Sequence, residues 1–167
     1  MALKRLLKNI SLKNKLFNAA KAYQKNDFEQ AKKIYLQILE IDPDNFKGLL
    51  WLGSLYSEMG LYSESITKLE RCIEKNPTDM RPYHNLAILQ AELQRYELSI
   101  ETSEKALKSC KMNNNRRAEI YYHIGYINFK LKKYSEAIDF ANKALKIRHN
   151  YQQAEQMKMN AFNSLKM

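Results

Sequence analysis

Glycine and proline are scarce in this sequence of 167 residues, which contains 4 glycines and 3 prolines. These low counts exclude a flexible linker rich in glycine or proline. They are also too low for a sheet whose strands are joined by many tight turns. Hydrophobic residues nevertheless make up 45% of the chain, which favours a folded core over intrinsic disorder. A chain of this length is about one ordinary domain, and its composition favours an all-α fold.

Cysteine is also rare, since Cys72 and Cys110 are the only two in the sequence. Their separation fits neither a disulfide framework nor a metal-binding pair, and two such thiols are typical of a reducing compartment. The sequence lacks an apolar run long enough to span a bilayer. Its first ten residues lack the apolar segment and cleavage site of a signal peptide. We therefore predict a cytoplasmic protein.

Motifs that carry chemistry are missing as well. The chain contains 3 histidines, and His84 and His123 fall at non-equivalent positions of two predicted helices, while His149 falls in a connecting turn. There is no HExxH motif, no Cys–His pair at ligand spacing and no glycine-rich phosphate loop. We predict no enzymatic activity, no catalytic residue, no metal site and no cofactor.

Acidic residues are absent from the first 15 positions, and the formal net charge of the chain is +10. Five basic residues stand in that segment: Lys4, Arg5, Lys8, Lys13 and Lys15. Basic residues also outnumber acidic ones over residues 105–117 and 141–167. These runs are either solvated helix faces or the contact surface for an anionic partner, namely nucleic acid, a membrane surface or an acidic protein. They lack interleaved aromatic residues and a base-reading motif, which argues against nucleic acid.

What the sequence does contain is a repeat. Residues 52–66 are LGSLYSEMGLYSESI, and residues 124–138 are IGYINFKLKKYSEAI. Pro43 and Pro77 end two similar blocks and lie 34 positions apart. Each block contains two runs of apolar residues at helical spacing, so the sequence predicts a series of helix pairs.

Small residues recur at fixed places in these pairs. The first predicted helix of each pair carries Ala19, Gly53, Ala87 or Gly125. The second carries Ala31, Ser65, Ser99 or Ala137, and an aromatic residue precedes it: Phe28, Tyr62, Tyr96 or Tyr134. Helices that pack closely need small residues where their axes approach, which explains a glycine that costs about 1 kcal/mol inside a helix. The spacing from Ala87 to Gly125 is four residues longer than the period of 34. We expect these four extra residues to lie in a loop formed by the Asn-rich residues 111–117.

This pattern resembles the tetratricopeptide repeat family. The second block carries the resemblance best, through Trp51, Leu52, Gly53, Tyr56, Gly60, Tyr62, Ser65 and Pro77. The other blocks depart from it, with Asn26 and Lys132 at the turn glycine and His149 at the closing proline. The resemblance covers about residues 12–150. It implies an all-α solenoid, a right-handed superhelix of about four helix pairs at residues 12–45, 46–79, 80–113 and 118–151.

The ends of a solenoid need caps, because each end exposes an apolar face. Residues 151–167 carry one apolar stripe with polar residues elsewhere, and are predicted to be a C-terminal capping helix: the stripe is Tyr151, Ala154, Met157, Ala161 and Leu165. Residues 1–11 are predicted to be a separate basic amphipathic helix, with Ser11 capping the helix that follows. That segment is either an N-terminal cap or a contact surface for a membrane or an acidic partner. A third alternative is self-assembly, in which the exposed end faces stack copies head to tail.

The family resemblance also implies a function, that of a protein–protein interaction scaffold or adaptor. Its partner would bind in a concave groove lined by the first helix of each pair. Carried over to this sequence, the groove residues are Lys13, Leu16, Tyr23, Lys47, Leu50, Ser54, Arg81, His84, Ile88, Tyr122, Tyr126 and Phe129. This surface has an apolar to aromatic floor and a basic edge, so we predict a protein or peptide partner with apolar anchors and acidic residues. Some of these residues could instead pack against a neighbouring pair or the C-terminal helix.

Chaperone-binding members of the family hold a C-terminal carboxylate with a clamp of Lys, Asn, Lys and Arg side chains. At the matching positions this sequence has Leu16, Ala20, Trp51, Arg81 and Asn85. Arg81 alone keeps a suitable charge there. We therefore predict that this chain does not bind chaperone tails.

Overall fold

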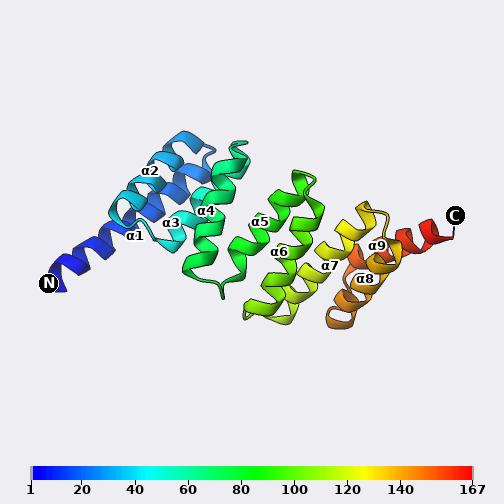
Figure 1. Ribbon diagram of the computed structural model, residues 1–167. Helices are drawn as coiled ribbons and strands as arrows, with labels where there is room; N and C mark the ends of the chain where they lie inside the picture. The colour runs from blue at the N-terminus through cyan, green and yellow to red at the C-terminus, as the bar shows by residue number, and fades with distance from the viewer. Residues whose placement is uncertain (1, 167) are drawn as a thin grey trace. The chain divides into compact units, whose positions relative to one another are not determined.

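The computed structural model describes residues 2–166, and over that range it consists of α-helices and their connections, with no strand (Figure 1). The helices are α1 (Ala2–Gln24), α2 (Phe28–Ile41), α3 (Phe46–Glu58), α4 (Tyr62–Lys75), α5 (Met80–Glu92), α6 (Tyr96–Ser109), α7 (Asn114–Lys130), α8 (Tyr134–Ile147) and α9 (Gln152–Leu165). The all-α prediction is confirmed. The chain divides into two compact units, Met1–Pro77 with α1–α4 and Thr78–Met167 with α5–α9.

The turn within each helix pair is the same in all four pairs. The predicted aromatic residue is the first residue of the second helix: Phe28 of α2, Tyr62 of α4, Tyr96 of α6 and Tyr134 of α8. Two residues before it the backbone is left-handed, with φ of 60° at Asn26, 75° at Gly60, 58° at Gln94 and 60° at Lys132. Gly60 adopts this conformation freely, whereas a residue with a Cβ atom is strained there. Three of the four turns therefore form without glycine at this position.

The small residues meet where the two helices of a pair approach. The hydroxyl of Ser65 donates to the carbonyl of Gly53 at 2.7 Å, and Ser99 makes the equivalent bond to Ala87 at 2.6 Å. A Cβ atom added at Gly53 would lie 3.0 Å from Cγ of Leu69. The predicted close packing is therefore present in the second and third pairs, and serine adds a hydrogen bond across it.

The four extra residues before the last pair lengthen a helix instead of a loop. α7 has 17 residues and α5 has 13, a difference of four. The side chain of Asn113 caps α7 by accepting from the N–H of Arg116 at 2.9 Å, and Arg116 pairs with Glu119 at 2.9 Å. The prediction of a loop over residues 111–117 is wrong from residue 114 onward, because the cap and the ion pair stabilise the first turn.

The N-terminal segment is continuous with the first helix of the first pair. α1 runs without a break from Ala2 to Gln24, so the prediction that Ser11 begins a new helix is wrong. The N-terminal turns of α1 extend past the end of α2 (Figure 1). Leu12 and Ala19, further along α1, are buried in the core of this unit together with Tyr35.

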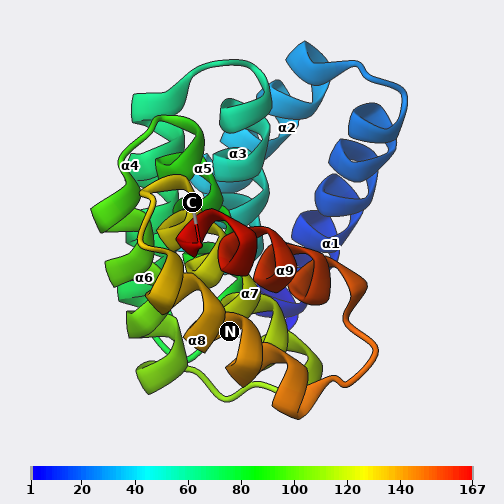
Figure 2. The same ribbon diagram turned by 90° about the vertical axis from the view of Figure 1, so that its right-hand side faces the viewer.

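The C-terminal helix α9 packs on α8 and α7, as the view in Figure 2 shows. Its inner face is buried, and consists of Ala154, Met157 and Ala161, preceded by Tyr151. Three large apolar residues of the same helix are exposed: Met159, Phe162 and Leu165. The prediction that the other faces of this helix are polar is therefore wrong in part. Within residues 2–166, none of the helices has the length and hydropathy that a membrane span requires.

Candidate functional site

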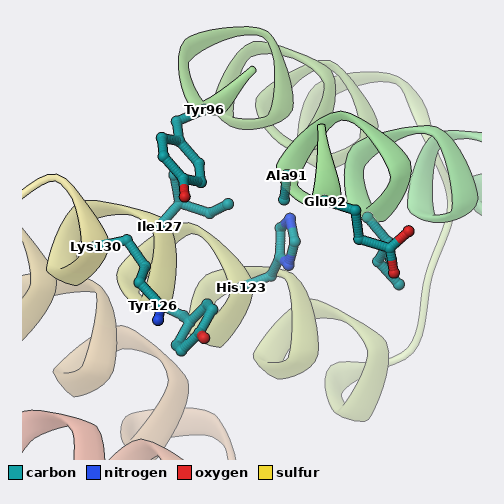
Figure 3. A pocket seen from close by; sticks show the side chains of 8 residues that line it. Ala91, Glu92, Tyr96, His123, Tyr126, Ile127 and Lys130 are labelled. Atoms are coloured by element: carbon teal, nitrogen blue, oxygen red, sulfur yellow. The ribbon is translucent and has the colours of Figure 1, made fainter. Parts of the chain in front are cut away.

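A groove of about 310 Å³ lies between α5 and α7 in the unit that begins at Thr78 (Figure 3). Its lining residues are Ile88, Ala91, Glu92, Tyr96, His123, Tyr126, Ile127 and Lys130. The α7 members are spaced by three, four and seven positions, which puts them on one face of that helix. The α5 members are spaced by three and four in the same way. The groove is thus formed by the first helices of two successive pairs, with one residue from the start of α6.

Two of the large apolar side chains that line this groove are exposed to solvent. Ile88 of α5 is 37% exposed and Tyr126 of α7 is 40% exposed. Ile127 lies deeper and is buried. Large apolar residues that stay exposed beside a cavity are typical of a surface that binds another apolar group.

The rim of the groove carries charges of both signs. Glu92 on α5 and Lys130 on α7 are both exposed. The Nζ atom of Lys130 lies 5.3 Å from the ring centre of Tyr126, within the range of a cation–π contact. The rim therefore offers one acceptor and one donor to the backbone or side chains of a bound segment.

His123 adds a defined hydrogen-bonding group to the lining. Its ring projects from α7 toward Ala91 of α5 (Figure 3), and its Nε2 atom lies 3.0 Å from Oγ of Ser99. Ser99 already gives its only hydroxyl hydrogen to the carbonyl of Ala87. Nε2 of His123 must therefore carry the hydrogen, which leaves Nδ1 as an acceptor.

Burial keeps His123 neutral. Desolvation, with a smaller contribution from the neighbouring His84, lowers the pKa of His123 to about 4. Burial also lowers the pKa of His84, which lines a small cavity together with His123. Neither ring suits proton transfer near neutral pH. Within residues 2–166 no three His, Cys, Asp or Glu residues gather into a metal-binding cluster.

Ile88 and Tyr126 are the two predicted groove residues of this unit that line the groove. The other four predicted residues, Arg81, His84, Tyr122 and Phe129, do not line it. Each of them interacts with or lies beside other residues of this unit. Arg81 pairs with Asp79 at 2.6 Å, the ring of Tyr122 lies 5.2 Å from that of Tyr151, and the ring of Phe129 lies 5.7 Å from that of Tyr134. His84 lies in the small cavity beside His123. The alternative that some of these residues pack against the C-terminal helix therefore holds for Tyr122, whose neighbour Tyr151 directly precedes α9, whereas Phe129 packs on the second helix of its own pair.

In the unit that ends at Pro77, two of the predicted groove residues are largely withdrawn from solvent. Leu50 is 1% exposed, so it offers no surface to a partner, and its prediction as a groove residue is wrong. Leu16 is half-buried against the core of this unit. Lys13 and Lys47 are exposed, as expected of the basic edge.

Two further predicted groove residues in this unit form hydrogen bonds of their own. The hydroxyl of Tyr23 donates to the carboxylate of Glu58, a bond that raises the pKa of this tyrosine to about 12. The hydroxyl of Ser54 donates to the carbonyl of Leu50 at 3.0 Å. Tyr23 thus connects the first helices of two successive pairs, α1 and α3.

Sequence reasoning missed Tyr96, His123 and Ile127 as groove residues. A signal for His123 was present, because it stands three positions before Tyr126 and so shares its helix face. No such signal exists for Tyr96, since it belongs to the second helix of a pair. The family pattern assigns the groove to first helices alone.

Comparisons with known proteins identify the repeat. Two family models, both described as tetratricopeptide repeat, match residues 22–89 and residues 78–150. This chain belongs to the tetratricopeptide repeat family. Membership in this family of interaction modules supports the role of a protein-interaction scaffold.

Among curated proteins, this tetratricopeptide repeat chain is similar to part of the wheat (Triticum aestivum) Hsp70-Hsp90 organizing protein, with 31% identity over 97 residues. The match covers 52% of this chain and 17% of that protein. The Hsp70-Hsp90 organizing protein 3 of Arabidopsis thaliana is 22% identical over 86 residues, covering 52% of this chain and 15% of its own length. The chain therefore spans less than a fifth of the length of these relatives.

Among solved structures, the MamA protein superposes with a TM-score of 0.79 at 24% identity, covering 92% of this chain and 81% of that chain. The Pseudomonas aeruginosa pilF structure superposes with a TM-score of 0.80 at 16% identity, covering 95% of this chain and 71% of that chain. At these identities the likeness shows the fold alone, which is a helical solenoid.

Proposed function

We propose that this chain binds a short segment of a partner protein in the groove between α5 and α7. One observation carries the proposal: Ile88 and Tyr126 stay exposed on facing helices beside a cavity of about 310 Å³. Ligand sites in proteins run from about 300 to 1,000 Å³. A groove at the lower end of that range suits one or two side chains of a peptide better than a large cofactor.

The chemistry of the lining specifies the segment further. An aliphatic or aromatic anchor residue would displace water from Ile88 and Tyr126, which provides most of the binding energy. The Nδ1 acceptor of His123 suits a backbone N–H of the segment. Lys130 suits an acidic residue beside the anchor, in agreement with the predicted partner that combines apolar anchors with acidic residues.

The test begins with a displayed library of random peptides, selected on the immobilised full chain. The selected peptide is then synthesised with a fluorophore and titrated with wild-type protein, Ile88→Glu and Leu98→Glu. Leu98 is the matched control, because it is a large apolar residue of α6 that is 46% exposed and lies outside the groove. We expect Ile88→Glu to weaken binding by about tenfold or more, since a carboxylate would be buried under the anchor. Leu98→Glu should stay within about twofold of wild type.

Equal affinity of Ile88→Glu and wild type would overturn the proposal, provided that both variants retain the wild-type melting temperature. Equal losses in both variants would also overturn it, because binding would then depend on general surface hydrophobicity. A photo-crosslinking residue at Tyr126 supplies an independent measurement. It should form a crosslink to the anchor residue of the bound peptide.

A further inference from the structure

α1 carries two apolar faces, and only one of them packs into the protein. The helix advances by about 100° per residue, so Leu12, Leu16 and Ala19 share one face. That face contributes to the core of the unit formed by α1–α4. A second set of apolar residues lies on the opposite side, about 160° away by the same geometry. We name this set the outer stripe of α1.

The residues of the outer stripe are all exposed to solvent. Its exposed fractions are 68% at Leu3, 55% at Leu6, 57% at Leu7, 48% at Ile10 and 69% at Phe17. From Leu3 to Phe17 the stripe runs about 21 Å along the helix axis, since each residue adds about 1.5 Å. A row of large apolar side chains of this length is unusual on a surface with no other role.

Positive charge is concentrated in the part of the sequence that contains this helix. The first 26 residues contain seven basic residues, Lys4, Arg5, Lys8, Lys13, Lys15, Lys21 and Lys25, and the first acidic residue is Asp27. The chain as a whole has a net charge of +10, so the remaining 141 residues carry +10 − 7 = +3. Most of the net charge of the protein therefore accompanies the outer stripe.

We propose that the outer stripe of α1 binds the surface of an anionic lipid bilayer. A helix with an apolar face and basic residues around it lies in the plane of the interface, with the apolar side chains among the lipid chains and the charges at the headgroups. The opposite face of α1 remains packed on the α1–α4 core in this orientation. Binding therefore needs no unfolding.

Charge decides between a bilayer and a second copy of this chain. Two outer stripes that packed on each other would bring together two N-terminal segments, each with seven basic and no acidic residues in its first 26 positions, and like charge opposes that pairing. A bilayer also requires no complementary pocket, only apolar area and opposite charge. The outer stripe is a single row along a helix and fits that requirement.

The test uses flotation of the full chain with vesicles of phosphatidylcholine alone and with vesicles that contain about 30% phosphatidylglycerol. We expect partition into the anionic vesicles and little into the neutral ones. The triple variant Leu6→Ser, Leu7→Ser, Ile10→Ser should partition at least about tenfold less. The matched control is Met159→Ser, Phe162→Ser, Leu165→Ser, which removes three equally exposed apolar side chains from α9 and should stay within about twofold of wild type.

Insertion is distinguished from mere electrostatic adsorption by an environment-sensitive dye. The dye is attached to Leu7→Cys, in the outer stripe, or to Asn9→Cys, about 100° from its centre, and the two native cysteines are buried. A blue shift with anionic vesicles is expected at position 7 and not at position 9. Absence of partition into anionic vesicles, or equal partition of wild type and the stripe variant, would overturn the proposal. It would also be overturned if the stripe variant instead changed a dimer into a monomer, or lost binding to an acidic peptide, with no vesicle binding by wild type.

Discussion

Oγ of Ser99 lies 3.0 Å from Nε2 of His123, and the same oxygen donates its hydrogen to the carbonyl of Ala87 at 2.6 Å. Ser99 belongs to α6, Ala87 to α5 and His123 to α7. One hydroxyl therefore connects both helices of the third pair to the first helix of the fourth. The connection adjoins the proposed peptide groove, because His123 also lines that groove.

This junction predicts a pH dependence of stability. The pKa of His123 is lowered to about 4 in the folded protein, below its unfolded value of about 6.5. The unfolded chain therefore binds protons first as the pH falls, and stability is lost between about pH 6.5 and pH 4. The loss attributable to this residue is on the order of 2–3 kcal/mol. It is measured by urea unfolding at several pH values, with His123→Leu as the control that should flatten the curve over this range.

Substitution by glutamate should destabilise the protein more at a buried residue of the predicted groove than at an exposed one. Leu50→Glu places a carboxylate at a site that is 1% exposed, and we expect a loss of at least about 3 kcal/mol of unfolding free energy. Ile88→Glu changes a site that is 37% exposed, and should cost less than about 1 kcal/mol. Chemical denaturation of both variants measures the difference. Equal losses would contradict the burial described for Leu50.

Lys132 adopts a left-handed backbone with φ of 60° at a turn where the equivalent residue of the second pair is Gly60. Lys132→Gly removes the clash of the Cβ atom and should stabilise the protein by about 1 kcal/mol. Lys133→Gly is the matched control, because its φ is −85° and glycine relieves nothing there. Thermal unfolding should rank Lys132→Gly above wild type and Lys133→Gly no higher than wild type.

Gly53 should not tolerate a larger residue. A Cβ atom at this position would lie 3.0 Å from both Cγ and Cδ2 of Leu69, so Gly53→Leu should cost about 1–3 kcal/mol. Because the clash is with Leu69, the double variant Gly53→Leu, Leu69→Ala should recover part of the loss in a double-mutant cycle. A melting temperature of Gly53→Leu within a degree of wild type would refute the close packing of this pair.

The similarity to Hsp70-Hsp90 organizing proteins makes the predicted absence of a carboxylate clamp worth measuring. Leu16, Ala20 and Trp51 stand at positions where such a clamp needs charged or amide side chains. A chaperone-tail peptide with a free C-terminus should bind no better than the same peptide with an amidated C-terminus, to within about twofold. A preference of about tenfold for the free carboxylate would show that another set of residues forms a clamp.

The local features of the fold were predictable because they depend on residues close in the sequence. Three features recur in the sequence: the period of 34 residues, the aromatic residue at each turn and the small residues that face one another. They recur because each helix pair packs in the same way. The length of α7 was not predicted. Asn113, which caps this helix, and Glu119, which pairs with Arg116 in its first turns, are both visible in the sequence. An Asn-rich run favours a loop by composition, and only the hydrogen bonds and the ion pair show that it continues a helix.

The groove illustrates what sequence and structure each decide. The family resemblance assigned Ile88 and Tyr126 to the predicted groove, and spacing along a helix determines which other residues share that face. Neither determines how deeply each is covered, and there Leu50 and Ile88 differ, at 1% and 37% exposed. The sequence by itself determined the helix pairs, the family and the basic amphipathic character of the first residues. Tertiary structure alone decided that Tyr96 joins the groove and that the outer stripe of α1 faces away from the core, because these depend on contacts between distant segments.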